Sequence, residues 1–202
     1  MKKTLKYIGF WLVQCTWGIV MTLIGALVTL VLIIAGKKPK HLGPVVYTEV
    51  GKYWGGLELG GFFLVCENSG SHTKLHEAGH GLQNMIWGPL FPFVVAIPSA
   101  TRYWLRNCTG QINKSMFAFV YMLVTLVVTT GIICLAQFVL NWAWLVYVAE
   151  AFRAYFLCVT IWMAAFEIPK YDQKTPYYYD DIWFEGQATR WGEKHFTKYI
   201  QK

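Results

Sequence analysis

The sequence predicts a mainly α-helical membrane protein with about three transmembrane helices, a re-entrant segment, a small β-hairpin and a helix that carries the pattern His-Glu-x-x-His. Only 14% of the 202 residues are charged and 55% are hydrophobic, whereas a soluble domain has roughly 25% charged residues. The apolar residues gather in three long runs that contain almost no charge, and the two histidines of the pattern lie between the first run and the second.

The first run covers residues 8–35 and follows Lys2, Lys3 and Lys6. It is too long for the apolar part of a signal peptide and shows no convincing cleavage site, so residues 1–36 are expected to form an N-terminal membrane anchor. Basic residues follow directly after this anchor, in the stretch 37–40.

Two short stretches after the anchor have strand character. They are residues 45–50 and residues 57–65, and glycines separate and punctuate them. We expect a small β-hairpin whose edge strand, near Leu57–Val65, could align a peptide by backbone hydrogen bonds. The alternative interpretation is a flexible linker, because glycine within strands weakens them.

The stretch Leu75–Gln83 contains His76, Glu77 and His80. Residues four apart lie on one face of a helix, roughly 6 Å apart along its axis, so the two imidazoles can converge on one metal ion. Glu77 lies beside them and is expected to act as the general base that takes a proton from a metal-bound water. The five cysteines form no CxxC pair, which disfavours cysteine as a ligand and leaves Zn²⁺ on imidazole and carboxylate as the predicted cofactor.

The remaining chain has three parts. Residues 88–106 are apolar but too short to span and interrupted by prolines, which favours a re-entrant or interfacial segment. Residues 116–140 and 142–166 are each long enough to span and are expected to form a transmembrane helical hairpin. Residues 167–202 form a polar, aromatic and amphipathic tail with a short helix. The expected organisation is therefore 1–36, 37–115, 116–166 and 167–202.

Several of these stretches together resemble an uncharacterised family of small bacterial membrane proteins with an HExGH motif. The similar stretches are Gly56-Leu57-Glu58-Leu59-Gly60, His76-Glu77-Ala78-Gly79-His80 with Gln83, Gly88-Pro89-Leu90, Ile97-Pro98-Ser99, and Tyr178-Tyr179 with Glu185-x-x-Ala188. The tail also looks like the ExxAD helix of CAAX-processing and HtpX-type membrane zinc metallopeptidases, which are zincin-like. Two departures are visible: Thr189 stands where that group has an aspartate, and residues 116–166 look like an insertion relative to the small family.

A catalytic zinc usually has three protein ligands and a water, so a third ligand is needed besides His76 and His80. The resemblance and the helical ExxA setting imply Glu185. Other candidates stay open at this point: Asp180 or Asp181 in the same segment, Glu150 within an apolar run with Arg153 one turn on, and His72 four residues before His76. His41 and His195 have no motif around them.

The two histidines and Glu185 must share one side of the bilayer, which the helical hairpin allows because it returns the chain to its starting side. Fourteen of the 18 Lys and Arg residues then fall on that side and three on the other. Positive-inside counting places this face in the cytoplasm of a bacterial-type inner membrane, although the basic N-terminus argues for the opposite orientation.

These observations favour a membrane-associated zinc metallopeptidase with Glu77 as the catalytic residue and His76, His80 and Glu185 as metal ligands. The expected partners are the lipid bilayer and a peptide or protein substrate, with no nucleic acid, since no basic patch has the interleaved aromatics of a nucleic-acid groove. The alternative from another class is a metal-stabilised membrane scaffold or binding protein that has no catalytic activity. A third function class, with less support, is a small channel or transporter subunit that uses Glu150 and Arg153.

Overall fold

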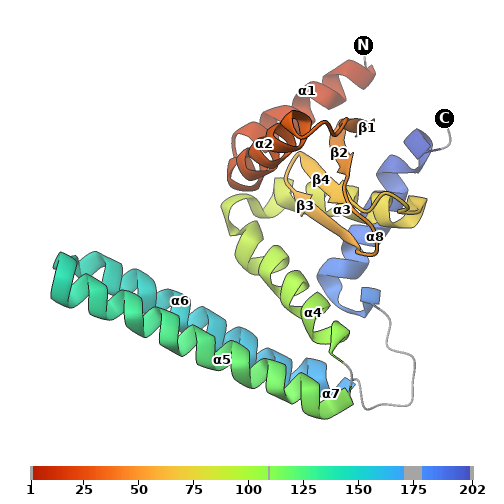
Figure 1. Ribbon diagram of the computed structural model, residues 1–202. Coiled ribbons are helices and arrows are strands. Elements are labelled where there is room, and N and C mark those ends of the chain that lie inside the picture. The colour runs from red at the N-terminus through yellow and green to blue at the C-terminus, as the bar shows by residue number, and fades with distance from the viewer. Residues whose placement is uncertain (1, 109, 171–178, 201–202) are drawn as a thin grey trace. The chain divides into compact units, whose positions relative to one another are not determined.

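The computed structural model describes residues 2–108, 110–170 and 179–200, which belong to two compact units. The first unit contains Met1–Ile97 and Tyr178–Lys202, and the second contains Pro98–Tyr177. The first unit holds helices α1 (Lys2–Cys15), α2 (Ile19–Ile34), α3 (Ser71–Trp87) and α8 (Trp183–Ile200) around a small sheet (Figure 1). The prediction of a mainly helical protein is confirmed.

The sheet has four strands where the sequence predicted a hairpin. Their order is β1 (Lys40–Leu42), β2 (Val45–Glu49), β4 (Phe62–Val65) and β3 (Gly56–Leu59). The antiparallel hairpin of this sheet is the β3–β4 pair, formed within the second predicted stretch and not between residues 45–50 and 57–65. Its tight turn lies at Gly60, whose φ of +75° favours glycine. β2 adds in parallel to β4, and β1 pairs antiparallel with β2. β3 is therefore one edge of the sheet.

The first apolar run is a broken helix, not one continuous span. α1 and α2 meet at an angle of 100° across a three-residue break. The break is held by α3, because Trp17 Nε1 donates to the carbonyl of Ile86 (3.0 Å) and Asn84 Nδ2 donates to the carbonyl of Gly18 (3.1 Å). An apolar run predicts a helix by composition alone, and these long-range hydrogen bonds that bend it have no local signature.

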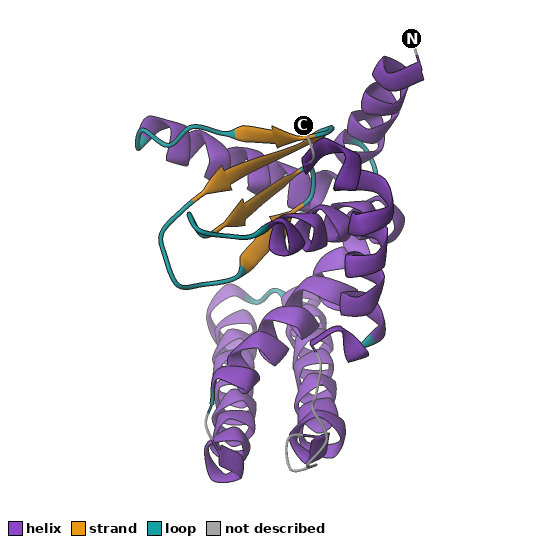
Figure 2. Ribbon diagram, turned by 90° about the vertical axis from the view of Figure 1, so that its right-hand side faces the viewer, coloured by secondary structure: helices purple, strands orange, loops and turns teal. Residues whose placement is uncertain are grey.

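The core of the first unit lies between one face of the sheet and helices α1, α3 and α8 (Figure 2). Burial of apolar side chains on amphipathic faces is what holds these elements together. The buried residues of this core are Phe10, Leu42, Val45, Phe63, Val65, Leu75, Ala78 and Phe196.

The segment after α3 continues as a 3₁₀ turn, η1 (Gly88–Leu90), and a π-helical turn, η2 (Pro92–Ala96). Phe91 and Val95 of this segment are buried in a second cluster with Met21, Leu59 and Phe184. Part of the apolar character that favoured a re-entrant segment therefore serves packing within the first unit.

The second unit contains the predicted helical hairpin. Its elements are α4 (Ile97–Asn107), α5 (Gly110–Cys134), η3 (Leu135–Leu140), α6 (Ala143–Trp162), η4 (Met163–Glu167) and α7 (Ile168–Lys170). Residues 112–140 and 143–170 form two helices long and apolar enough to cross a membrane, and the bent α1–α2 pair makes a third if it counts as one span. Asn141, in the left-handed region at φ +52°, turns the chain between them.

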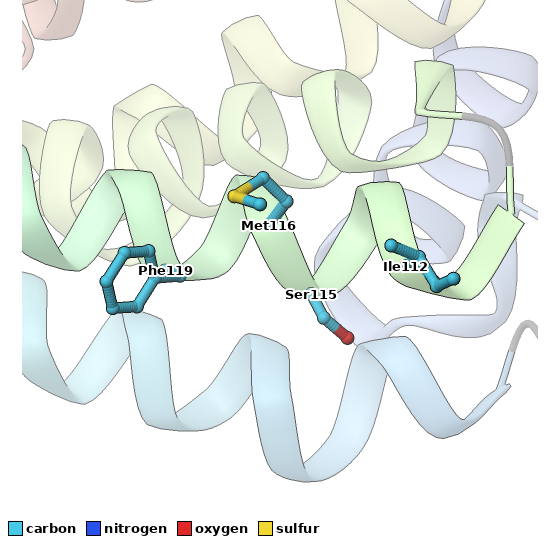
Figure 3. Close-up of a pocket in the computed structure, with 4 residues that line it drawn as sticks. All are labelled: Ile112, Ser115, Met116 and Phe119. Carbon is cyan, nitrogen blue, oxygen red and sulfur yellow. The ribbon is translucent and has the colours of Figure 1, made fainter.

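Arg102, near the end of the predicted re-entrant segment 88–106, is fully buried. Its Nε donates to Glu167 Oε2 at 2.9 Å, and neither side chain is exposed. An open hollow on α5 is lined by Ile112, Ser115, Met116 and Phe119 (Figure 3). It carries no charged or metal-ligating side chain, so it is not a candidate active site.

Candidate metal centre

Three buried side chains converge from α3 and α8. His76 Nε2 and His80 Nε2 lie 3.1 Å apart, and Glu185 Oε2 lies 3.1 Å from the first and 3.2 Å from the second. Among the described residues, these are the His, Cys, Asp and Glu side chains whose donor atoms gather closely enough to hold a metal ion. The structure thus brings together the two histidines and the glutamate that the sequence singled out.

The spacing of these donor atoms fits a small tetrahedral cation. Ligand atoms about 2.0–2.1 Å from a tetrahedral zinc are about 3.3 Å from one another. The three separations in this chain, from 3.1 to 3.2 Å, are close to that value. Glu185 Oε1 is in addition buried without a hydrogen-bond partner, and a buried carboxylate oxygen with no partner calls for a cation or a donor.

The outer nitrogens of both imidazoles are held by side chains. His80 Nδ1 lies 2.7 Å from Gln83 Oε1, and Gln83 Nε2 donates to the backbone carbonyl of Phe184 at 2.7 Å. Because a carbonyl can only accept, the amide nitrogen of Gln83 must face Phe184 and its oxygen must face His80. His80 Nδ1 therefore keeps its proton, and Nε2 is the ring nitrogen that faces the site and can offer a lone pair to a metal ion once its own proton is lost.

The second imidazole is held by the residue that departs from the HtpX-like pattern. His76 Nδ1 lies 2.8 Å from Thr189 Oγ1. A hydroxyl accepts from an N–H as a carboxylate does, so Thr189 can hold the ring of His76. Thr189 could not be assigned this role from the sequence, because its bond to His76 depends on how α3 and α8 cross. Gln83 lies three residues after His80 on the same helix, a local spacing, and only its orientation depends on α8, through the carbonyl of Phe184.

Small residues set that crossing. A Cβ at Gly79 would overlap the carbonyl oxygen of Ala188, and a Cβ at Gly192 would overlap the carbonyl oxygen of Leu75. The two helices therefore touch backbone to backbone at two points next to the site. This close approach is what lets the short side chain of Glu185, in the first turn of α8, reach both imidazoles.

Glu77 points from α3 towards β3. It is buried, and a Cβ at Gly56 would overlap its carboxyl group. Gly56 begins the edge strand, so the absence of a side chain there makes the room in which Glu77 sits. The strand that begins beside Glu77 is thus the edge of the sheet nearest to the candidate base.

A second glutamate from β3 lies near the site and was not recognised from the sequence as functional. Glu58 is buried, and its Oε1 accepts a hydrogen bond from the backbone N–H of Gly60 at 2.5 Å. It occurs in the stretch Gly56–Gly60 that supported the family resemblance. Its visible role is to hold the β3–β4 turn.

Burial and charge shift the pKa values of these groups in different directions. Burial raises the pKa of Glu77, opposed by the charges of His76 and His80. Burial also favours protonation of Glu185, but hydrogen bonds from both histidines outweigh it and hold its pKa well below the usual range. Burial lowers the pKa of His80, but Glu185 more than compensates and raises it to about 9. The centre of the site favours a positive charge.

The other candidates lie elsewhere. His72 is on α3 and stacks on His76 with ring centroids 6.4 Å apart, but it is exposed and does not join the donor group. Asp180 and Asp181 lie in the 3₁₀ turn η5 (Tyr179–Asp181) before α8. Glu150 belongs to the second unit, His41 to β1 and His195 to α8. Tyr178, part of the quoted tail motif, lies outside the described residues.

No protein-family model, no curated protein and no solved structure matches this chain. The family resemblance stated from the motifs therefore stays a prediction, and the function has to be argued from the site itself.

Proposed function

We propose that this chain is a membrane-associated zinc metallopeptidase in which His76, His80 and Glu185 hold the metal and Glu77 is the catalytic base. The observation that carries this proposal is the buried group of three donor atoms, in which Gln83 orients the ring of His80 so that Nε2 faces the centre. Two imidazoles and one carboxylate are a ligand set of catalytic zinc sites, which keep a further position open for water.

A bound zinc ion would supply the Lewis acid that polarises a peptide carbonyl and makes a water molecule acidic. The residues of the chain have separate tasks. Glu77 accepts the proton of the attacking water on its carboxylate and passes it to the leaving amine. Gln83 and Thr189 hold the imidazole rings in place through their Nδ1 atoms. Gly56 leaves the space that Glu77 needs.

The edge strand suits a peptide substrate. β3 is hydrogen-bonded to β4 on one side only, and its first residue lies against Glu77. A peptide that added to this edge would present its backbone next to the catalytic base. At its other end β3 is closed off, because the carbonyl of Leu59 lies against Gly25 of α2. The open part is therefore short and is limited to the first residues of the strand.

The proposal also keeps the predicted location, with the site facing the cytoplasm. His80 and Glu185 are separated in sequence by two candidate spans. Two crossings return the chain to the same side, whether or not the bent α1–α2 pair crosses as well. The distribution of Lys and Arg is what favours the cytoplasmic side.

The decisive experiment compares peptide cleavage and zinc content of the wild type with those of Glu77→Gln, in liposomes. The amide keeps the shape of the side chain but accepts no proton, so cleavage should fall by about 10²–10⁴-fold while zinc content stays near one per chain. His76→Ala serves as the metal-free reference, and Glu193→Gln, on the exposed side of α8, as the control.

Equal cleavage by the wild type and Glu77→Gln would remove Glu77 from the mechanism. If the wild type binds zinc but cleaves no member of a broad peptide library, the metal-stabilised scaffold becomes the better description. Stoichiometric zinc in the His76→Ala protein would contradict the metal site itself.

A further inference from the structure

The helical hairpin of the second unit contains a charged cluster that the metal centre does not use. Arg153 of α6 donates from Nη1 to Glu150 Oε1 at 3.1 Å, from Nε to Thr129 Oγ1 at 3.0 Å and from Nη2 to Thr130 Oγ1 at 3.0 Å. Glu150 lies about two helical turns inside the candidate span that begins at Ala143. Ionisable groups at such positions are expensive and usually have a function.

The two ion pairs of this unit differ in how they are enclosed. Arg102 and Glu167 are both fully buried, so that pair is closed by the hairpin and its neighbouring helix. The side chain of Glu150 is 50% exposed and that of Arg153 is 23% exposed. Within the part of the chain that the structure describes, the carboxylate of Glu150 pairs with Arg153. Half of a carboxylate side chain therefore faces outward along a helix whose surroundings are apolar.

The surface around Glu150 is shaped for another helix. Ala151, Ala154 and Cys158 follow Glu150 along the same side of α6, and all three are exposed. Small side chains allow membrane helices to approach closely, and interhelical hydrogen bonds then stabilise the contact. We call the surface formed by these residues together with the partly exposed side chain of Arg153 the α6 face; its members are Glu150, Ala151, Arg153, Ala154 and Cys158.

We infer that a second copy of this chain docks on the α6 face, related by a two-fold axis along the membrane normal. Two copies inserted in the same direction place their α6 helices at equal depth. The face carries one acid and one base a single turn apart, so it is complementary to itself. Glu150 would pair with the partner's Arg153, and the same contact would occur twice.

Arg153 has the capacity for this additional bond. A guanidinium has five N–H groups, and three are used in the contacts with Glu150, Thr129 and Thr130. The inner contacts fix the guanidinium against α5, and the remaining N–H groups are free to reach the partner's carboxylate. The docked pair would enclose Glu150 as Glu167 is enclosed by Arg102.

The first test uses the native cysteines in the full chain, reconstituted in liposomes at several lipid-to-protein ratios. A variant that keeps Cys158 and has the other cysteines replaced by serine should give a covalent dimer with a short bismaleimide. The matched control keeps only Cys134, which is exposed on α5 and lies off the α6 face, and should stay monomeric. Linkage through Cys134 but not Cys158, or a monomer at every ratio, would overturn the proposal.

The second test uses charge. Glu150→Gln should weaken self-association measured by energy transfer by about tenfold, the loss of two symmetry-related hydrogen bonds. Glu150→Arg and Arg153→Glu should each fail to self-associate and should pair with one another when mixed, because opposite charges then face each other. Circular dichroism of each variant in the same liposomes reports that its helices are formed. Unchanged association in Glu150→Gln, or a purified monomer that links only to a different membrane protein in cells, would contradict a second copy as the occupant.

Discussion

The motif residue Gly79 offers the sharpest test of how α3 and α8 build the metal centre. In Gly79→Ala the new Cβ would overlap the carbonyl oxygen of Ala188. Non-bonded heavy atoms prefer about 3.5–4.0 Å, so the helices must separate by on the order of 1 Å. Glu185 lies one turn before Ala188 and would move with it, whereas metal–ligand distances tolerate only about 0.2 Å. We expect zinc affinity to fall by more than tenfold and stability to fall by about 1–3 kcal/mol.

The matched control is Gly81→Ala, two residues further along the same helix. Its Cβ would meet the carbonyl oxygen of Gly60 at 3.1 Å, a tight contact that a small adjustment relieves. Both substitutions gain the same helix propensity, up to about 1 kcal/mol, so their difference isolates the contact with α8. Zinc affinity is measured by competition with a chelator, and stability by thermal unfolding of the metal-free proteins. Equal affinities for the two variants would refute the close crossing as the source of the site's geometry.

Two further predictions concern the ligands. Glu185→Gln should weaken zinc binding by at least tenfold, whereas Glu193→Gln on the same helix should leave it unchanged; the same chelator titration distinguishes them. His80 has a folded-state pKa of about 9, above its ordinary 6.5, so its charged contact with Glu185 stabilises the metal-free protein fully below pH 6.5. That contribution to the free energy of unfolding is lost as the pH rises to about 9, at up to about 1.4 kcal/mol per pH unit. Thermal unfolding of His80→Gln at several pH values should lack this dependence on pH.

The residues of the site that could be predicted are those whose spacing along one helix identifies them. His76 and His80 follow from their separation of four residues, and Glu77 from its place between them. Glu185 is distant in sequence and was reached through the resemblance of its ExxA stretch. Thr189 and Gly56 owe their roles to the packing of α3 against α8 and β3, and no pattern in one segment encodes a contact with another. The contact of Gln83 with His80, three residues apart on α3, has a local spacing.

In the fold, too, features of a single segment could be predicted and contacts between segments could not. Length and composition were sufficient for the α5–α6 hairpin, because a span is a property of one segment. The sheet was underestimated because β1 has only three residues and includes Lys40 and His41, and because the parallel pairing of β2 with β4 is non-local. The bend between α1 and α2 could not be predicted for a related reason. Apolar composition does not indicate which backbone carbonyls will accept hydrogen bonds from another helix.

That bend also changes what the N-terminal segment is for. Gln14 and Asn84 are both fully buried, Asn84 Nδ2 donates to Gln14 Oε1 at 2.6 Å, and Gln14 Nε2 donates to the carbonyl of Gly81 at 2.8 Å. Removing residues 1–36 would leave these polar groups of α3 without partners, and buried groups left unpaired are costly. Gly81 directly follows His80, so the cost would fall on the helix that carries two of the proposed metal ligands. The N-terminal helices are therefore part of the structure that holds the site, and a detachable anchor would not need such contacts.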